Sequence, residues 1–319
     1  MEGVAAAAEE MDRRLKSPAA PDVPAPRRPE MDDWLNARIF HPLAGRLARI
    51  LAATPATPNS VSVAGGLLIV AAAILYTGLA WPASVLLGFL AHALWHVFDG
   101  ADGDLARRTG KASPIGELVD GLCDYLGHIV LYVFLAAFLD DWIGGWAWFV
   151  AALAGASRIL QSNHAESGRR TYLWRVYGVE WLKHSYERDR GALRRTGLVA
   201  RLAEPFARAY VRVASAASPL SPRIDALLER ASRAPTAEER ARRICREESR
   251  IPLRLQTALG PNLRTVALGL AMAARSPLWF FLLEISGLNL LMLLSLARQR
   301  KADRRILHRL EGNATMLGA

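Results

Sequence analysis

Cysteine is scarce in this sequence, which contains only Cys123 and Cys245 among 319 residues. A disulfide framework therefore does not organise the fold, and the chain offers no Cys/His set for a zinc site. The beginning of the chain also lacks the apolar core of a signal peptide, because residues 1–30 are rich in Ala, Pro, Arg and Glu. We expect residues 1–30 to be a disordered tail.

Apolar residues, by contrast, make up 52% of the chain and gather in a few runs. A helix needs about twenty apolar residues to cross a bilayer, and most of these runs approach that length. The sequence therefore predicts an all-α, polytopic membrane protein with six transmembrane helices. The expected spans are Val61–Trp81, Pro82–Phe98, Gly116–Leu139, Trp142–Leu160, Asn262–Ala274 and Pro277–Leu296.

Composition divides the chain outside the spans into segments of different character. Residues 31–56 carry apolar and arginine positions at helical spacing but are too polar to span, which is typical of an amphipathic helix in the membrane interface. Residues 164–260 are dense in arginine and predict a helical cytoplasmic insertion, and residues 301–319 predict a cytoplasmic tail. The predicted catalytic membrane core is residues 57–163, with spans one to four, and residues 261–300 hold spans five and six.

The formal net charge is +10, and nearly all of the surplus is arginine outside the apolar runs. Such a surplus occurs in nucleic-acid-binding proteins, but in a membrane protein it indicates cytoplasmic charge near anionic lipid. We therefore expect membrane lipids, and not nucleic acid, as partners. The turns near Trp81 and Asp140 lack Lys and Arg, whereas the segment after Arg107 is basic. This asymmetry predicts that both termini face the cytoplasm, and the Ala- and Arg-rich composition favours a bacterial inner membrane.

One acidic stretch interrupts the apolar pattern. Residues 99–124 read DGADGDLARRTGKASPIGELVDGLCD and place carboxylates at Asp99, Asp102, Asp120 and Asp124. Residues three or four apart share one face of a helix, so the carboxylates of each pair point the same way. Asp104 falls on the other side of its helix, and we expect it to be solvated. The pattern predicts that two acidic helix faces confront each other.

Carboxylates that converge without cations repel one another, so a pair of divalent ions is the simplest explanation of the acidic faces. Oxygen ligands suit Mg²⁺ or Mn²⁺. Gly103 and Ala106 leave the same face bare for a phosphate or nucleotide, and Arg107 offers a bidentate donor to phosphate. This combination predicts metal-assisted phosphoryl transfer. A cation-transport pathway is the alternative, but no acidic residue continues it through residues 126–139.

The same residues carry a resemblance to a known family. The pattern D-x-x-D-G-x-x-A-R, followed by G-x-x-x-D-x-x-x-D, resembles the signature of the CDP-alcohol phosphatidyltransferases. The tract SPIGELVDGLCD is also similar to the corresponding segment of the choline and ethanolamine phosphotransferases. The resemblance implies a membrane enzyme of phospholipid biosynthesis that uses a CDP-alcohol donor, an alcohol acceptor and two divalent ions. The signature positions are Asp99, Asp102, Gly103, Ala106, Arg107, Gly116, Asp120 and Asp124.

The resemblance also implies roles for individual residues. Asp99, Asp102 and Asp120 would hold the metals, and Asp124 would both bind one of them and act as the general base. The nucleotide would contact the bare helix face and the TPN turn before the first span, although a capped turn alone also explains TPN. The expected nucleotide-binding residues are Thr57, Pro58, Asn59, Ser60, Gly103, Ala106, Arg107, Ser113 and Gly116. A homodimer is a further implication.

The acceptor is less well specified. Arg169, Arg170 and Arg175, just beyond the fourth expected span, are candidates for binding an anionic headgroup; a solvated basic cluster is the alternative. The motif is shared by enzymes that transfer a phosphatidyl group from CDP-diacylglycerol to a soluble alcohol with release of CMP, and by enzymes that transfer a choline-, ethanolamine- or inositol-type headgroup to a lipid alcohol. We favour CDP-diacylglycerol as the donor. A cation or lipid transporter that reuses the acidic cluster is the remote alternative.

Overall fold

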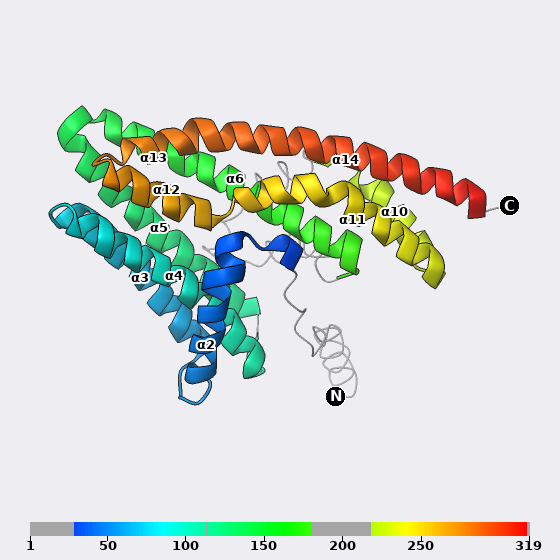
Figure 1. Cartoon of the computed structure of the whole chain (residues 1–319), viewed down its shortest axis with the longest axis horizontal. Coiled ribbons are helices and arrows are strands. Elements are labelled where there is room, and N and C mark those ends of the chain that lie inside the picture. Colours follow the sequence, from blue (N-terminus) through cyan, green and yellow to red (C-terminus); the bar gives the residue numbers. More distant parts are fainter. Residues whose placement is uncertain (1–28, 113, 180–217, 318–319) are drawn as a thin grey trace, which may run out of the picture.

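The computed structural model describes residues 29–112, 114–179 and 218–317, and every regular element within these ranges is a helix (Figure 1). The expected disordered tail lies almost wholly outside the described residues, as does the part of the expected insertion at 180–217. The α-helices are α2 (His41–Leu51), α3 (Pro58–Gly78), α4 (Ala83–Arg108), α5 (Pro114–Ile143), α6 (Trp146–Tyr177), α10 (Ser221–Ala231), α11 (Pro235–Ala258), α12 (Pro261–Ala273), α13 (Leu278–Leu282) and α14 (Leu288–Leu317).

Shorter or wider turns complete the helical elements. A 3-10 turn, η1, covers Pro29–Met31, and two π-helical turns, η2 (Asn36–Phe40) and η3 (Leu283–Gly287), join their neighbours into longer helices. The helix predicted within residues 31–56 is therefore present, through η2 and α2. Phe40, Ala44 and Ala48 on one of its faces are buried in a cluster with residues of α4. That this helix lies in a membrane interface stays a prediction.

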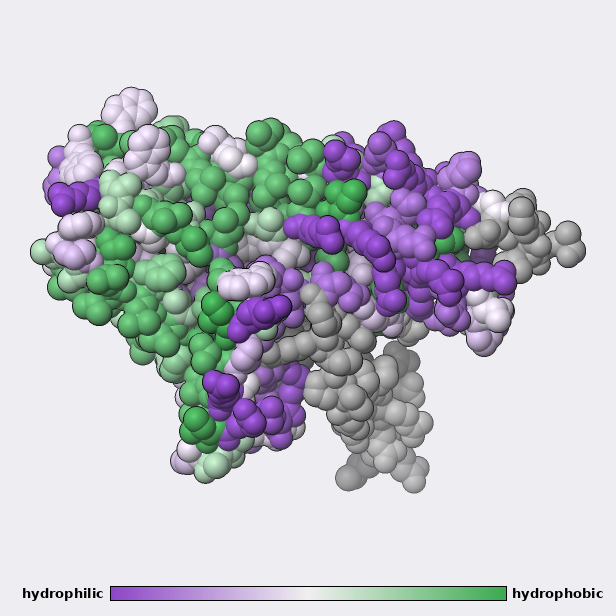
Figure 2. Space-filling view, in the orientation of Figure 1, coloured by the Kyte–Doolittle hydropathy of each residue, from purple (hydrophilic) through white to green (hydrophobic). Residues whose placement is uncertain are grey.

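Four helices of the described chain are long and apolar enough to cross a membrane. They are Pro58–Gly78, Ala83–Arg108, Val119–Ile143 and Leu278–Gly312. The expectation of six spans is not confirmed, because α6 and α12, where the fourth and fifth spans were expected, do not qualify. In α6 the apolar first half runs on into a polar second half, and α12 has only 13 residues. Figure 2 shows the resulting division of the surface, hydrophobic over one end of the molecule and hydrophilic around α10, α11 and the end of α14.

Two of the long helices pass through boundaries that the composition suggests. The expected limit of the catalytic core at residue 163 falls inside α6, and the expected start of the tail at residue 301 falls inside α14. Arginine is a good helix former, so a change from apolar to basic composition does not end a helix. Gly178 ends α6 instead, with a left-handed backbone (φ 68°) that favours glycine.

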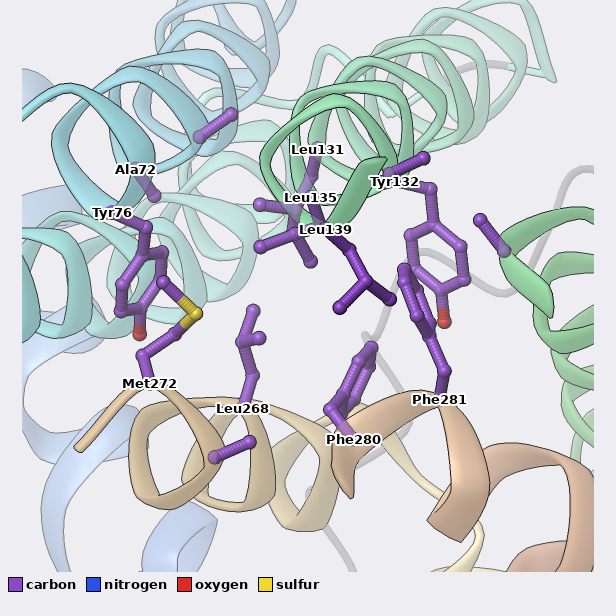
Figure 3. Packing of buried hydrophobic residues seen from close by; sticks show 14 of the residues in the cluster. Ala72, Tyr76, Leu131, Tyr132, Leu135, Leu139, Leu268, Met272, Phe280 and Phe281 are labelled. Carbon is purple, nitrogen blue, oxygen red and sulfur yellow. The ribbon is translucent and has the colours of Figure 1, made fainter. Parts of the chain in front are cut away.

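The hydrophobic end of the molecule has its own core, built from α3, α4, α5, α6, α12 and α13 (Figure 3). Leu131, Leu135 and Leu139 repeat at helical spacing along α5 and fill the centre of this cluster. Phe280 and Phe281 pack on Tyr132 with ring centroids 5.8 and 5.5 Å apart. The helices that carry the acidic stretch are thus held at their apolar ends by side-chain packing.

The hydrophilic end has a second core between α6, α10, α11 and α14. Ile224, Ile244 and Ile306 are buried there, each from a different helix. Arg175 of α6 is buried among them and pairs with Asp303 of α14 at 2.6 Å, and its guanidinium also donates to the Ser221 hydroxyl at 2.8 Å. The described part of the arginine-rich segment is therefore a packed helical unit.

Replacing Arg175 with methionine is expected to destabilise this second core by about 3 to 5 kcal/mol, because Asp303 is 1% exposed and would keep a buried charge without its partner. The free energy of unfolding can be measured by urea titration of the circular dichroism in detergent. The matched control is Arg243→Met, since Arg243 and its partner Glu239 are 65% and 74% exposed. That control should lose at most about 1 kcal/mol. Equal stability of the two variants would contradict a stabilising role for the buried pair.

Candidate active site

The two acidic helices meet because α3 lies against both of them with small residues. A Cβ atom at Gly66 would lie 3.2 Å from Cys123 of α5, and one at Gly65 would lie 3.5 Å from Phe98 of α4. Such positions let helix backbones approach closely. Gly110, with φ 64°, turns the chain after α4 and directs it back toward α5. These small residues bring together the ends of α4 and α5 that carry the acidic stretch. Both ends are predicted to face the cytoplasm.

The four aspartates converge at this junction. Carboxylate oxygens of Asp99 on α4 and of Asp120 and Asp124 on α5 lie within 4.8 Å of one another. These three side chains are partly buried, whereas Asp102 is buried and accepts a hydrogen bond of 2.5 Å from the Ser62 hydroxyl of α3. The predicted confrontation of two acidic helix faces is therefore confirmed.

The donor chemistry of this cluster fits a divalent cation. Oxygen atoms from three carboxylates can act as ligands, and Mg²⁺ and Mn²⁺ prefer such ligands. Within the described part of the chain, no Arg or Lys forms an ion pair with any of the four aspartates. Carboxylates gathered in a partly buried place without a cationic partner repel one another, so a bound metal ion would stabilise the arrangement.

Two residues that hold the acidic cluster carry no recognisable sequence signal. Trp95 lies one helical turn before Asp99, and its indole N–H donates a hydrogen bond of 2.7 Å to Asp124 on the other acidic helix. The indole is buried and packs on His128 and His96. Trp95 therefore fixes the orientation of the Asp124 carboxylate, as Ser62 does for Asp102.

The structure describes most of the residues that are expected to bind a nucleotide. Thr57 caps α3, because its hydroxyl accepts from the Ser60 backbone N–H at 3.2 Å and the Ser60 hydroxyl accepts in return from the Thr57 N–H at 3.1 Å. Pro58 and Asn59 form the first turn of this helix, with Asn59 exposed. Gly103, Ala106 and Gly116 are partly accessible, and Ser113 lies outside the described residues.

Asp104 differs from expectation, and Arg107 is the residue that pairs with it. Asp104 was expected to be solvated, but its side chain is only 13% exposed and forms an ion pair with Arg107. The correction has a simple cause, since Gly45 of α2 lies close to the Asp104 carboxylate and shields it. The Arg107 side chain remains 40% exposed beside Gly103. A phosphate would therefore compete with Asp104 for this guanidinium.

A cavity of about 630 Å³ adjoins the acidic cluster. Asp99, Asp124 and Trp95 line one part of it. One long wall follows α5 and α6 and is apolar at Ile129, Val133 and Ala151, while polar groups of α6 and α12 line another part. Met31, Asp33 and Asn36 from the N-terminal segment also border it, and Asp33 is tied to α12 by a hydrogen bond of 2.6 Å from Asn262. The cavity thus offers both an apolar and a polar region next to the carboxylates.

The arginines expected to bind an acceptor are divided by the structure. Arg169 lines the cavity, and both Arg169 and Arg170 donate hydrogen bonds to Glu166. Burial would raise the pKa of Glu166, but the hydrogen bonds and charges of the two arginines hold that pKa below its ordinary value. Arg175 does not line the cavity, because it is buried in the second core with Asp303.

Comparison with known proteins adds a family to this geometry. Residues 55–172 match the family model described as CDP-alcohol phosphatidyltransferase, a range that begins before α3, ends within α6 and includes all four aspartates. No curated protein and no solved structure matches the chain. The family in general depends on divalent metal and acts on CDP-alcohols in membranes, in agreement with the acidic cluster and the apolar helices. Residues 55–172 are therefore similar to a CDP-alcohol phosphatidyltransferase domain, within a chain whose described part has four helices long and apolar enough to cross a membrane.

Proposed function

We propose that this enzyme transfers a phosphatidyl group from CDP-diacylglycerol to an alcohol acceptor and releases CMP. The observation that carries the proposal is the cluster of Asp99, Asp120 and Asp124, whose oxygens approach within 4.8 Å inside a domain of the matching family. The apolar wall of the adjoining cavity supports a lipid donor, since acyl chains can lie along Ile129 and Val133 beside the reacting groups.

Asp99, Asp102, Asp120 and Asp124 would hold two divalent ions, Mg²⁺ or Mn²⁺. When bound, the ions neutralise the diphosphate of the donor and stabilise CMP as it leaves. Ser62 and Trp95 keep the carboxylates of Asp102 and Asp124 in place, so that little reorganisation is needed on binding.

Asp124 is proposed to act as the general base as well. Its carboxylate takes the proton of the acceptor hydroxyl, whose oxygen forms a bond to the phosphorus that carries the diacylglycerol group. The bond between that phosphorus and the bridging oxygen breaks, and the electron pair leaves with CMP. Asp124 lines the cavity, where an acceptor hydroxyl can reach it, and the hydrogen bond from Trp95 engages only one of its oxygens.

The nucleotide is proposed to lie against the bare part of α4 and the start of α3. Gly103, Ala106 and Gly116 leave room for it, Arg107 and Ser113 donate to its phosphates, and the turn at Thr57, Pro58, Asn59 and Ser60 borders it. We place this site at the cytoplasmic face of a bacterial inner membrane, because the segment around Arg107 is basic and the opposite turns are not. Six spans, with α6 and α12 completing the bundle, and a homodimer belong to the same proposal.

The test is CMP release by the purified protein in lipid-detergent micelles with Mg²⁺. CDP-diacylglycerol is supplied in one reaction, and CDP-choline, CDP-ethanolamine or CDP-inositol in parallel reactions, each with a mixed acceptor pool. Release from CDP-diacylglycerol is expected. Release only from a CDP-headgroup would replace the proposal by transfer of that headgroup to a lipid alcohol, which the apolar cavity wall can also accommodate. No release from any donor would overturn both and favour transport.

A further inference from the structure

The segment predicted as a cytoplasmic insertion reaches the cavity beside the acidic cluster. Its helix α11 ends at Ala258, and Leu253, Gln256 and Thr257 near that end line the cavity. All three lie outside residues 55–172, which match the family model. The insertion therefore contributes part of the cavity wall in addition to its packing in the second core, and Gln256 supplies a carboxamide to that wall.

A chain of buried hydrogen bonds fixes the orientation of this carboxamide. Oδ1 of Asp303 accepts from Arg175 at 2.6 Å and from the side-chain nitrogen of Gln299 at 3.0 Å. Because a carboxylate that pairs with arginine only accepts, Gln299 turns its nitrogen toward Asp303 and its carbonyl oxygen toward Gln256. The side-chain nitrogen of Gln256 donates to that oxygen at 3.3 Å. The order of donors and acceptors thus runs in one direction, from the buried ion pair to the cavity.

The carbonyl oxygen of Gln256 is left as the last acceptor of this chain. No residue in the described part of the protein donates a hydrogen bond to it. Gln256 is only 4% exposed and packs on α6 at Gly168, where a Cβ atom would lie 2.2 Å from the same oxygen. A buried carbonyl oxygen without a partner is costly, so a hydrogen-bond donor in the cavity that Gln256 lines would stabilise the site.

Gln256 and the acidic cluster lie toward the same end of the cavity. α5 and α6 touch where a Cβ atom at Gly155 would lie 3.7 Å from the Tyr132 ring, and the chain reverses between these helices. From this contact, at about 1.5 Å per residue, α5 leads to Asp124 over about 12 Å, and α6 leads in the same sense to Gly168, beside Gln256, over about 20 Å. Because both side chains line one cavity from different walls, a single bound molecule can contact both.

The proposed reaction assigns this wall to the acceptor. The nucleotide is proposed to lie against α3 and α4, and the acyl chains along α5, which leaves the polar wall of α6 and α11 for the alcohol. A neutral carbonyl oxygen does not compensate the cost of burying an ammonium group, whereas a hydroxyl carries no charge and needs only one such acceptor. The reacting hydroxyl has to reach Asp124, so the hydroxyl at Gln256 is a second one.

We propose that Gln256 accepts a hydrogen bond from a non-reacting hydroxyl of the acceptor, so that the enzyme selects a polyhydroxy alcohol. This inference rests on the proposed function, in which Asp124 takes the proton of the reacting hydroxyl. Gln299 acts through Gln256 and is a positioning residue. The insertion thereby takes part in the choice of acceptor, a role distinct from its packing in the second core.

The test compares the acceptor that supports CMP release from CDP-diacylglycerol with its analogue lacking one non-reacting hydroxyl. The pairs are glycerol and propane-1,3-diol, glycerol 3-phosphate and 3-hydroxypropyl phosphate, and inositol 1-phosphate and its monodeoxy analogues. In the native protein, loss of the contacting hydroxyl should lower kcat/KM at least about tenfold. Preference for an alcohol with a single hydroxyl, such as serine, would overturn the inference.

Gln256→Met removes the carbonyl oxygen and keeps the length of the side chain. It should lower kcat/KM at least about tenfold for the hydroxylated acceptor but less than about twofold for the deoxy analogue. An equal loss with both acceptors would reveal a purely structural role and overturn the inference. Gln299→Met frees the Gln256 carboxamide to rotate and should give an intermediate loss of preference. The matched control is Arg254→Met, an exposed α11 residue that does not line the cavity, and it should leave the preference unchanged.

A second measurement separates this inference from the proposed function. Calorimetric titration with the same acceptor pairs, in detergent with Mg²⁺ and CMP but without donor, gives the affinities of the native protein and of Gln256→Met. CMP release with the same acceptor preference in both proteins would overturn the hydroxyl contact and leave the reaction standing. Absence of CMP release from every donor, with a binding preference that needs Gln256, would overturn the reaction and leave the contact standing. Absence of both would overturn both.

Discussion

Asp124→Asn is expected to lower the rate of CMP formation by at least about a hundredfold, because the amide cannot take the proton of the acceptor hydroxyl. The variant keeps the size of the side chain and a carbonyl oxygen that can still accept the hydrogen bond from Trp95. At a saturating Mg²⁺ concentration, which offsets the loss of one charged metal ligand, binding of the CDP-alcohol donor should therefore stay within about twofold of the native protein. Steady-state CMP release and direct binding of a labelled donor, measured on the same preparation, provide the two quantities.

The matched control for this variant is Asp141→Asn. Asp141 is exposed near the opposite end of α5, far along the helix from Asp124, and its replacement should leave both the rate and the donor affinity unchanged. Near-native turnover in Asp124→Asn would remove the base assignment. Loss of donor binding together with turnover would reduce Asp124 to a binding residue.

Asp120→Asn and Asp99→Asn are expected to raise the Mg²⁺ concentration for half-maximal activity by at least about tenfold, since each removes a charged ligand from the three-carboxylate cluster. Raising the metal concentration should recover part of the activity of these variants but none of the activity of Asp124→Asn. Asp102→Asn should have a smaller effect on metal affinity, because the Asp102 carboxylate is held by Ser62 and lies outside that cluster.

The metal dependence can be measured twice, through activity and through Mn²⁺ binding followed by electron paramagnetic resonance. The second measurement needs no substrate and so does not depend on the proposed reaction. Native metal affinity in Asp120→Asn would exclude this residue from the ligand set. Unchanged affinity in both variants would leave the acidic cluster without a metal role.

The acidic cluster could be predicted from sequence because its information is local. Asp99 and Asp102 share a helix face by spacing alone, as do Asp120 and Asp124, and the glycine turn between the helices is short. The partners of these carboxylates could not be predicted. Ser62 is 40 residues from Asp102, and Trp95 is 29 residues from Asp124. Which serine or tryptophan meets which aspartate depends on the packing of α3, α4 and α5, which no spacing encodes.

The arginines show the same limit. Sequence pattern singled out Arg169, Arg170 and Arg175 because they follow an apolar run closely, but it has no means of telling a buried ion pair from a ligand contact. In the structure Arg175 forms a buried ion pair with Asp303. Arg158, which lies in the sequence of the predicted fourth span, lines the cavity. A hydropathy pattern counts an arginine inside an apolar run only as a reduction of mean hydropathy, and it does not indicate that the side chain lines a cavity.

The number of spans was similarly beyond pattern alone. Apolar runs identify α3, α4, α5 and the helix from Leu278 to Gly312 well, since each contains an apolar stretch long enough to cross a membrane. The apolar run of α6 is followed by polar sequence in the same helix, so the helix is longer than its apolar segment. α12 has only 13 residues. Helix continuity through residue 163 arises from the absence of a helix-breaking residue and from packing in the second core, not from composition.

α6 and α14 are continuous helices that join the two ends of the molecule. The rotation of each helix about its axis is therefore the same at both ends. α6 contributes Ala151 and Ala154 to the first core and then, without interruption, Tyr172 and Val176 to the second core. α14 continues α13 and η3, which pack in the first core, and carries Ile306 into the second core. Inserting or deleting one residue between the two would rotate everything beyond it by about 100° around the helix axis. Arg158, which lines the cavity, and Arg175, which forms the buried ion pair, both lie on α6. The direction in which one side chain points from the helix axis therefore fixes the direction of the other. The hydrophilic end therefore cannot be exchanged as an independent module. Its exposed residues can be substituted, but the number of residues in α6 and α14 that join it to the hydrophobic end has to be kept.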